Sequence, residues 1–182
     1  MRDWRHCPRC AADLERRVPA GDDEERLLCP ACGLVLYENP APTAGAIVDD
    51  GDGRIMLVRR AIEPFKGKWD VPGGFIKPGE DGTDAVRREL AEELGVEVLV
   101  GAAAWVIADT YGAEGAPTLN IFYLARIVSG EPAPADDVAE FAWFGPDGLP
   151  PASEIAFACV RDVLARRRRG QSEAGSGIVN EA

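Results

Sequence analysis

The sequence predicts a mixed α/β domain that follows a small metal-dependent module. Two observations carry this prediction: β-rich runs and helix-like segments alternate after residue 43, and four of the five cysteines form two Cys-x-x-Cys pairs near the N-terminus. An apolar content of 46% over 182 residues suits one mid-sized core and an appendage. We expect a cysteine module at 1–38, a short stiff linker at 39–42, a main domain at 43–169 and a flexible tail at 170–182.

The chain is strongly acidic, with 31 Asp and Glu against 20 Lys and Arg and a net charge of −11. Such a surface repels phosphate backbones, so we expect no sequence-independent binding of nucleic acid. A phosphorylated small molecule is a compatible substrate, because metal ions neutralise the carboxylates that it approaches. No apolar run reaches the roughly 20 residues that cross a bilayer, and the N-terminus lacks the apolar core of a signal peptide. We therefore expect a cytoplasmic protein without membrane contact.

The cysteine module is predicted to bind one structural Zn²⁺ ion through Cys7, Cys10, Cys29 and Cys32. Each Cys-x-x-Cys turn presents two thiolates, and the 18 residues between the pairs fit the spacing of a zinc site. A dithiol redox pair is the alternative, but the expected βαβ setting is missing. Cys159 lies alone in an apolar stretch, and we interpret it as a small core residue.

The main domain begins with two β-rich runs at 43–48 and 54–59, joined by an Asp- and Gly-rich segment typical of a hairpin turn. A short strand at 69–71 leads into a Pro-Gly-Gly sequence. Further strands are predicted at 97–108, 119–128 and 140–144, and a final helix begins near Ser153 and Glu154.

A helix is predicted at 84–94, with Thr83 as its N-terminal cap and Gly95 as the left-handed residue that ends it. Its apolar residues, Val86, Leu90 and Leu94, lie four residues apart. This spacing forms a stripe that docks onto the sheet.

The same helix presents Glu89, Glu92 and Glu93 at an i, i+3, i+4 spacing, which places three carboxylates on one face. Clustered like charges destabilise an isolated helix, and a divalent cation between them removes that cost. Hard Mg²⁺ prefers such oxygen ligands. An ordinary amphipathic helix with a solvated glutamate-rich face is the alternative. The preceding loop contains Glu80, which Arg88 can pair with to hold the loop in place.

The sequence around this helix matches the Nudix box over 23 residues, 74–96. The constrained positions are Gly74, Glu80, Arg88-Glu89, Leu90, Glu92-Glu93, Gly95 and the aliphatic Val96. The chain resembles the Nudix hydrolases over about residues 43–168. That resemblance implies an α/β/α sandwich around a mixed sheet. It also implies an enzyme that splits a nucleoside diphosphate linked to another moiety into a nucleoside monophosphate and a phosphorylated product.

The resemblance also implies roles, position by position. Glu89, Glu92 and Glu93 would ligate the catalytic Mg²⁺ or Mn²⁺, with the carbonyl of Gly73 as a further ligand. Gly74, Glu80, Arg88 and Gly95 would support the structure of the box. The general base is either a box glutamate or a carboxylate on a later loop. Glu140 is our candidate outside the box, and an exposed glutamate that leads a strand is the rival interpretation.

Two groups of enzymes combine a zinc ribbon with a Nudix domain. The NADH pyrophosphatases carry a Ser-Gln-Pro-Trp-Pro-Phe element after the box, which this sequence lacks. The plant-type ADP-ribose/FAD pyrophosphatases and their bacterial relatives share the Tyr-x-Asn-Pro junction, here 37–40, and the Gly-x-Trp-x-x-Pro approach, here 67–72. We therefore favour ADP-ribose, FAD or a similar dinucleotide or nucleotide sugar, with NADH as the alternative.

Four residues are weaker candidates for substrate binding. Trp69 and Tyr111 can stack on a base, although isolated aromatics in strands are usually core residues. Arg59 and Arg60 end a strand near the predicted site and can hold a phosphate, although surface charge is the commoner explanation.

Two further functions stay open at this point. The box recognises pyrophosphate and metal rather than the base, so hydrolysis of an oxidised nucleoside triphosphate is compatible with it. A non-catalytic ligand sensor or regulator is an alternative of another class, but sensors often have eroded boxes, whereas every acidic position is intact here. Dimers are common among the relatives, so a homodimer is compatible with the resemblance.

Overall fold

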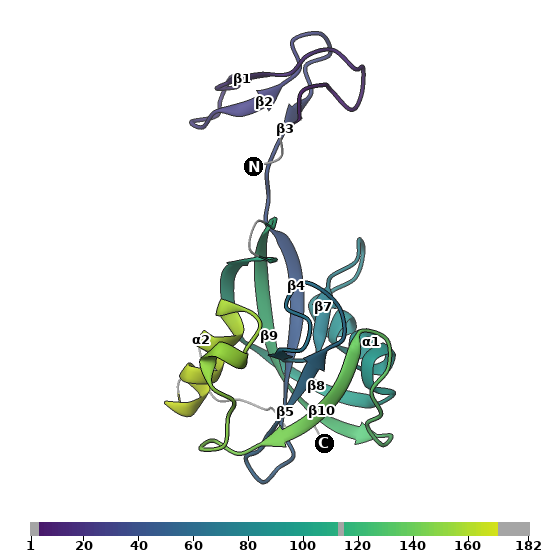
Figure 1. Ribbon diagram of the computed structural model, residues 1–182. Helices are drawn as coiled ribbons and strands as arrows, with labels where there is room; N and C mark the ends of the chain where they lie inside the picture. Colours follow the sequence, from purple (N-terminus) through teal and green to yellow (C-terminus); the bar gives the residue numbers. More distant parts are fainter. Residues whose placement is uncertain (1–3, 113–114, 171–182) are drawn as a thin grey trace. The chain divides into compact units, whose positions relative to one another are not determined.

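The computed structural model describes residues 4–112 and 115–170. The chain divides into two compact units, and the boundary in the sequence lies between Asn39 and Pro40 (Figure 1). The predicted flexible tail lies outside the described residues from residue 171 onward. In the described part of the chain, no helix has the length and apolar character to span a membrane.

The N-terminal unit is a three-stranded antiparallel sheet in the order β1-β2-β3. Its strands are β1 (Glu15–Arg17), β2 (Arg26–Leu28) and β3 (Val35–Leu36). Only Cys7 and Cys29 are buried among the described residues of this unit. The unit therefore has almost no apolar core of its own.

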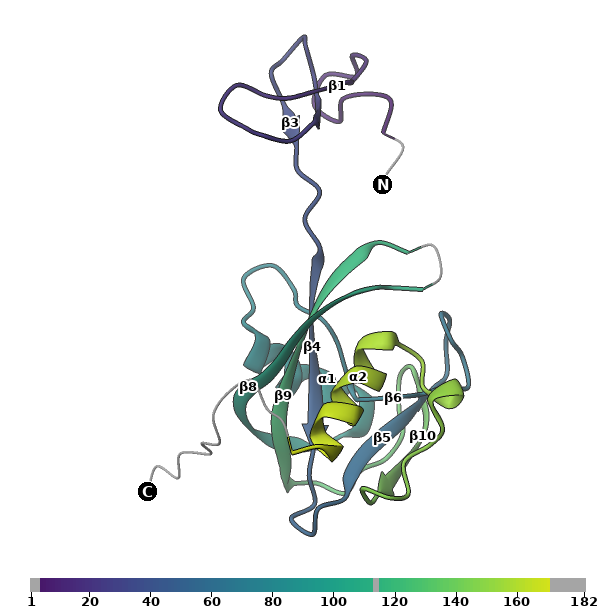
Figure 2. The same ribbon diagram turned by 90° about the vertical axis from the view of Figure 1, so that its left-hand side faces the viewer.

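The main unit contains two sheets. A mixed four-stranded sheet has the order β7-β4-β9-β8, in which β4 runs parallel to β9 and the other pairs are antiparallel. Its strands are β4 (Ala41–Val48), β7 (Gly73–Phe75), β8 (Glu97–Thr110) and β9 (Pro117–Ser129), the last two forming a long twisted pair (Figure 2). A three-stranded antiparallel sheet has the order β10-β5-β6. Its strands are β5 (Ile55–Arg60), β6 (Trp69–Asp70) and β10 (Val138–Phe144).

Two helices cover opposite sides of these sheets, α1 (Gly82–Leu94) and α2 (Ala158–Arg168), and a short 3₁₀ helix, η1 (Ala152–Glu154), precedes α2 (Figure 1). Alternation along the strands produces two cores. From β4, Ala44 and Val48 face the core under α1, whereas Ile47 faces the core under α2. This layering confirms the predicted Nudix sandwich with its mixed sheet.

Some expected boundaries were wrong. The turn at 49–54 does not make a hairpin, because β4 and β5 belong to different sheets and share only an isolated bridge. The linker is shorter than expected, because β4 already begins at Ala41 and Ile76 N–H donates to the carbonyl of Pro42. The N-terminal cap of α1 is Asp81 rather than Thr83.

The last helix also begins later than expected. Residues beside Ile155 run extended, since Ile155 bridges Trp69 of β6 and Ala156 N–H donates to the Trp69 carbonyl. The helix then starts at Ala158, where Asp109 at the end of β8 accepts the Cys159 N–H at 2.8 Å. Cys159 is buried, as expected for a core residue.

Candidate active site and zinc site

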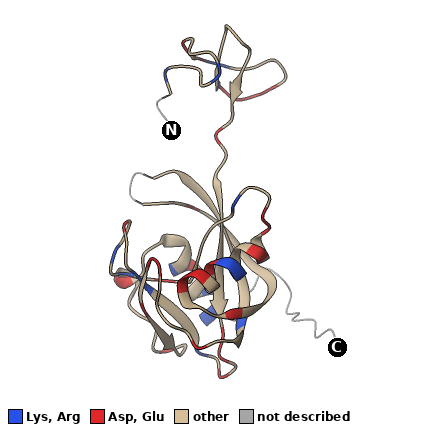
Figure 3. Cartoon of the chain, turned by 90° about the vertical axis from the view of Figure 1, so that its right-hand side faces the viewer, with Lys and Arg blue, Asp and Glu red and all other residues tan. Residues whose placement is uncertain are grey.

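The position of α1 is fixed at both ends by local sequence. The Asp81 carboxylate accepts the N–H groups of Thr83 and Asp84, and Gly95 ends the helix with φ of 68°. The three residues of the apolar stripe are all fully buried: Val86, Leu90 and Leu94. The charged residues of the helix therefore lie away from this buried stripe, and Figure 3 marks their positions along the ribbon.

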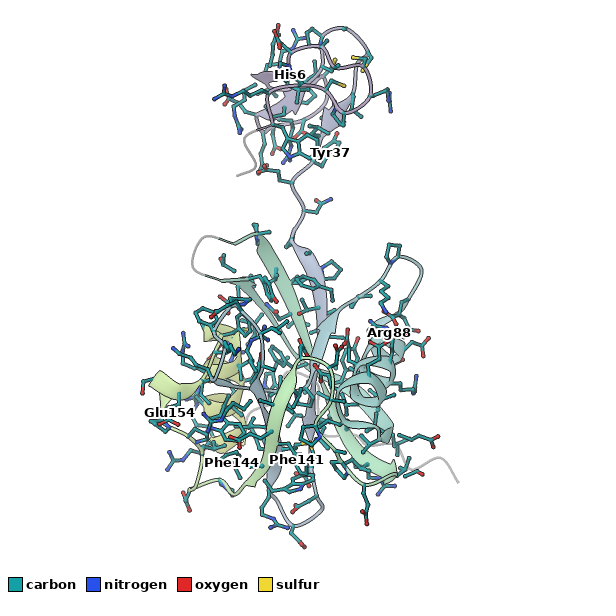
Figure 4. All side chains as sticks on the ribbon, turned by 45° about the vertical axis from the view of Figure 1, so that its right-hand side comes forward. His6, Tyr37, Arg88, Phe141, Phe144 and Glu154 are labelled. Carbon is teal, nitrogen blue, oxygen red and sulfur yellow. The ribbon has the colours of Figure 1, made fainter. Side chains whose placement is uncertain are left out.

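Arg88 organises the charges of this face (Figure 4). Its guanidinium grips both oxygens of Glu80, with Nε–Oε1 at 2.7 Å and Nη2–Oε2 at 2.9 Å, and donates to the Phe75 carbonyl. Nη1 reaches Glu89 Oε1 at 2.7 Å and Glu92 Oε2 at 3.1 Å. The hydrogen bond from Arg88, helped by the Lys77 N–H, lowers the pKa of Glu80 to about 2. The predicted pairing of Arg88 with the loop is therefore present.

Glu89 sits against the backbone of Gly74. A Cβ built at Gly74 would lie 2.3 Å from Glu89 Oε1, so any side chain there would displace the carboxylate. Partial burial raises the pKa of Glu89, while its contact with Arg88 opposes the rise. Only glycine at position 74 leaves room for the Glu89 carboxylate in this position.

Glu93 is the most deeply placed of the three carboxylates, with 5% of its surface exposed. The Gly73 N–H donates to its Oε2 at 3.1 Å. Burial raises the pKa of Glu93 well above its usual range, and the nearby negative charges of Asp137 and Glu89 raise it further. A buried carboxylate among like charges is stabilised by a cation.

A cavity of about 290 Å³ opens beside this helix. It gathers residues from both sheets, both helices and the loops before β10 and after β8. Its lining consists of Thr43, Ala44, Gly45, Arg60, Asp70, Val71, Gly73, Gly74, Phe75, Lys77, Glu89, Tyr111, Thr118, Asn120, Phe122, Asp137, Phe157, Cys159 and Val160. Glu93 lines a small adjoining recess together with Asp70 and Asp137.

Two acidic residues of this cavity were missed by the sequence analysis. Asp137 lies in the turn before β10, where its carbonyl accepts the Ala61 N–H. Asp70 is buried and pairs with Arg60 at 3.1 Å. Burial raises the pKa of Asp70 to about 6, although Arg60 opposes the rise. Asp137 lies three residues before Glu140, in the acidic segment 136–140 that the sequence offers as the later carboxylate loop.

Glu140 does not fit its predicted catalytic role. It pairs with Arg59 across β10 and β5, and Arg59 also lies over the Trp69 ring. Glu140, Arg59 and Trp69 lie on the face of the small sheet that points towards α2, which is also the face of Leu57. Glu93 lies on the α1 side. Glu140 and Arg59 also do not line the cavity.

The remaining candidates for substrate binding also differ in whether they line the cavity. Trp69 is 6% exposed and packs in the core, which contradicts base stacking by this residue. Arg60 and Tyr111 both line the cavity. Successive residues of a strand face opposite sides, which explains why Arg59 and Arg60 differ.

The carboxylates of Glu89, Asp70 and Asp137 at the cavity and of Glu93 in its recess are the oxygen ligands that a hard divalent cation prefers. Glu92 is exposed, at 3.8 Å from Lys77 Nζ, while Glu89 and Glu93 face the cavity and its recess. With Arg88 bound to Glu89 and Glu92, the three carboxylates do not form a tight cluster. Among described residues, only the four cysteines place three or more such ligand atoms within 4.8 Å of one another.

The cysteine site has the geometry of a structural zinc centre. Cys7 Sγ and Cys32 Sγ are 3.6 Å apart, and Cys10 Sγ and Cys29 Sγ are 3.5 Å apart. Bonds of about 2.3 Å in an ideal tetrahedron give sulfur separations of about 3.8 Å. The four predicted ligands therefore fit Zn²⁺.

Both turns of the zinc site end in a left-handed residue. Ala11 has φ of 61° and Gly33 has φ of 73°, each directly after the second cysteine of its pair. The turns are closed by Ala11 N–H to the Cys7 carbonyl and Gly33 N–H to the Cys29 carbonyl. The two knuckles thus repeat one backbone geometry.

Comparison with known families matches both units. The family described as "NUDIX domain" matches residues 39–163, and the family described as "Nudix N-terminal" matches residues 5–38.

Individual relatives agree with this assignment. An NAD-capped RNA hydrolase NudC of Pseudomonas aeruginosa is 32% identical over 177 residues, which cover 93% of this chain and 60% of that protein. An ADP-ribose pyrophosphatase of Methanocaldococcus jannaschii is 32% identical over 115 residues, covering 63% of this chain and 68% of that protein. The crystal structure of a NUDIX hydrolase from Nitrosomonas europaea is 27% identical, with a TM-score of 0.73, and covers 98% of this chain and 100% of that one. The chain thus spans 60% of the length of the NudC relative.

Proposed function

The chain belongs to the Nudix family and is a Nudix hydrolase, and from this premise we propose that it is a Mg²⁺- or Mn²⁺-dependent pyrophosphatase of ADP-ribose, FAD or a similar nucleoside diphosphate derivative. The observation that supports the proposal is that Glu89 and Asp137 line the cavity and Glu93 lines its adjoining recess together with Asp137. ADP-ribose pyrophosphatase and NudC relatives support the dinucleotide class.

The proposed mechanism uses the chain's own groups around one phosphorus atom. Glu89, Glu92 and Glu93, with the Gly73 carbonyl, would hold the divalent ions. The ions would supply charge neutralisation and would lower the pKa of the attacking water. Asp137 accepts the proton as the water oxygen attacks phosphorus and the bridging P–O bond breaks. Lys77, at the cavity, offers positive charge to the departing phosphate.

We propose Asp137 in place of Glu140 as the carboxylate outside the helix. Asp137 lines both the cavity and the recess of Glu93. Glu140 is held by Arg59 on the other face of the small sheet. An acceptor must lie within hydrogen-bond reach of the proton that it takes, and of Asp137 and Glu140 only Asp137 lines the cavity.

NADH is the second candidate substrate. The specific observation in its favour is the similarity to NudC over 93% of this chain, although the family element that accompanies NADH preference is absent from the sequence. ADP-ribose, FAD and NADH differ in the moiety attached to the ADP, so one panel of substrates separates them.

The test is product analysis with Mg²⁺ and with Mn²⁺ on ADP-ribose, FAD, NADH and 8-oxo-dGTP. We expect AMP and a phosphorylated second product from at least one ADP derivative, and a loss of kcat of about a hundredfold or more in Glu89→Gln. Asp137→Asn should lower kcat much more than Glu140→Gln. Absence of hydrolysis across the panel would refute the proposed function, and equal losses in the last two variants would remove Asp137 from the mechanism.

A further inference from the structure

Arg60 is the centre of a contact network at the cavity. Its Nε donates to the Pro64 carbonyl at 2.7 Å, Nη1 to Asp70 at 3.1 Å and Nη2 to the Tyr111 hydroxyl at 3.4 Å. The guanidinium carbon also lies 5.1 Å from the centre of the Phe157 ring. The side chain is 11% exposed. One arginine therefore joins four separate segments: the loop after β5, β6, the turn after β8 and the start of α2.

Two of the groups that Arg60 holds form an aromatic wall, which we define as Tyr111 and Phe157. Their ring centres are 5.6 Å apart and the ring planes differ by 19°, so the rings lie stacked. Phe75 of β7 meets the Tyr111 ring at 5.2 Å with an angle of 64°, which extends the wall towards Gly74 and the carboxylates. All three rings line the cavity. Only aromatic residues present such flat apolar faces to a ligand ring.

Three polar residues of the cavity lining, Thr43, Thr118 and Asn120, bind one another. Thr43 Oγ1 donates to Asn120 Oδ1 at 2.7 Å. Asn120 Nδ2 donates to the Ile107 carbonyl at 3.1 Å and to Thr118 Oγ1 at 3.0 Å. Most of their hydrogen-bonding capacity is thus already used within the protein. A sugar would find few free hydrogen-bonding partners here for its hydroxyls, so it would gain little binding free energy. A flat ring needs fewer such partners and would lose little.

We propose that Tyr111 and Phe157 form a subsite for a planar heteroaromatic ring of the substrate, and that Arg60 is the positioning residue that holds this wall. The proposal rests on the proposed function, because it names the part of a nucleotide that the cavity accepts. Arg60 acts through Tyr111 and Phe157 rather than on phosphate. Three of its nitrogens already donate to protein oxygens, and the carboxylate of Asp70 faces its guanidinium.

The ring can come from two sources, the adenine or the second moiety, and simple ligands distinguish them. AMP, nicotinamide mononucleotide and ribose 5-phosphate all carry a ribose phosphate and differ in the ring. Isothermal titration calorimetry on the full chain gives their Kd values without requiring turnover. We expect at least one ring-bearing ligand to bind about tenfold or more tightly than ribose 5-phosphate. The ring that gains more identifies the occupant of the subsite.

Variants then assign the residues. Tyr111→Ala should abolish the preference for the ring-bearing ligand and leave the Kd of ribose 5-phosphate within about twofold. Arg60→Met should weaken the same ligand severalfold, and Arg60→Lys should recover part of the loss, since lysine keeps the charge beside Asp70. The double variant Arg60→Met/Asp70→Asn guards against misfolding, because it leaves no unpaired buried charge. Arg54→Met is the matched control, because Arg54 makes an Arg–Asp pair with Asp50 at the opposite end of β5.

Steady-state kinetics supply a second readout. Tyr111→Ala should raise KM for the best substrate of the panel about tenfold and Arg60→Met should raise it severalfold. Each should change kcat by less than about threefold, while Arg54→Met changes neither KM nor kcat. Equal binding of ribose 5-phosphate and both nucleotides would overturn the subsite. A similar loss of ribose 5-phosphate and ring-bearing ligand in Arg60→Met would make Arg60 a phosphate ligand and overturn its positioning role. Failure of the proposed function shows instead as absence of hydrolysis in the wild type.

Discussion

The two units of this protein use metal ligands in opposite ways. In the N-terminal unit the only buried described residues are Cys7 and Cys29, so the ligands themselves are the core. In the main unit, two apolar clusters form without any ligand, and they place the carboxylates of α1 at a cavity. We therefore expect the first unit to need its ion to fold and the main unit to fold without one. This difference predicts separate responses to metal removal and to substitution.

The largest expected effect is loss of zinc. Chelation should remove hydrogen-exchange protection from residues 5–38 and leave protection in 43–168 largely unchanged, because zinc binding in such modules contributes about 10 kcal/mol or more of folding free energy. Exchange measured by mass spectrometry on the full chain checks this. Simultaneous loss of protection in both units would break the comparison. Cys159→Ala is the matched control, since it removes a buried cysteine from the main unit and should spare the zinc content.

The second prediction concerns Gly74 and sharpens the idea that the fold presents the catalytic groups. Gly74→Ala should lower kcat by about a hundredfold, because the new Cβ displaces the Glu89 carboxylate from its position. The unfolding temperature should change by only a few degrees, since the displaced atoms are the end of a flexible side chain. Gly101→Ala is the control: its Cβ would meet only Leu124, no closer than 3.4 Å. A normal kcat in Gly74→Ala would contradict the assignment of Glu89.

The third prediction is a pH dependence of stability from Glu80. Its pKa is lowered to about 2 by Arg88, so its ionised form stabilises the folded state. That contribution is fully present above the ordinary pKa near 4.5 and is lost as pH falls towards 2. Glu80→Gln should therefore be less stable than wild type at pH 6, and the difference should shrink below pH 4.5 in denaturant titrations. The control Glu154→Gln, in η1, should show a much smaller difference at pH 6.

The smallest expected effects lie in the zinc knuckles. Ala11→Gly should stabilise the N-terminal unit and Gly33→Ala should destabilise it, each by about 1 kcal/mol, because a left-handed backbone costs an L side chain about that much. Nothing lies within 4 Å of a Cβ at Gly33, so the effect there is conformational. Competition with a zinc chelator measures both. Effects of the same sign in the two variants would show that the knuckles are not equivalent.

Local patterns were sufficient for the box and the zinc site. Glu89, Glu92 and Glu93 lie about one helical turn apart, and each Cys-x-x-Cys pair lies within one tight turn. Arg88 pairs with Glu80, which lies only eight residues earlier in the chain. The cap of α1 at Asp81 was missed by two residues, because Thr83 is also a capping residue by type.

Features that depend on strand register could not be predicted from local sequence patterns. In β10 the pairing with β5 shifts between Val138 and Glu140, and this irregularity turns Glu140 towards α2 while Asp137 stays at the cavity. Simple alternation does not reveal such a shift. The late start of α2 has a similar cause, since β6 captures Ile155 in an extended form. The failed hairpin at 49–54 shows that a turn sequence fixes a reversal of direction but not the partner strand.

The alternation of β4 between two cores has a consequence for how this lineage can change in length. Ala44 and Val48 face one core and Ile47 faces the other, so inserting a single residue within the strand would exchange the small and large side chains between them. The turn at 49–54 is exposed or half-buried and joins two separate sheets, so it can absorb added residues without moving either register. Insertions and deletions among descendants should therefore gather in that turn and avoid the strand that precedes it.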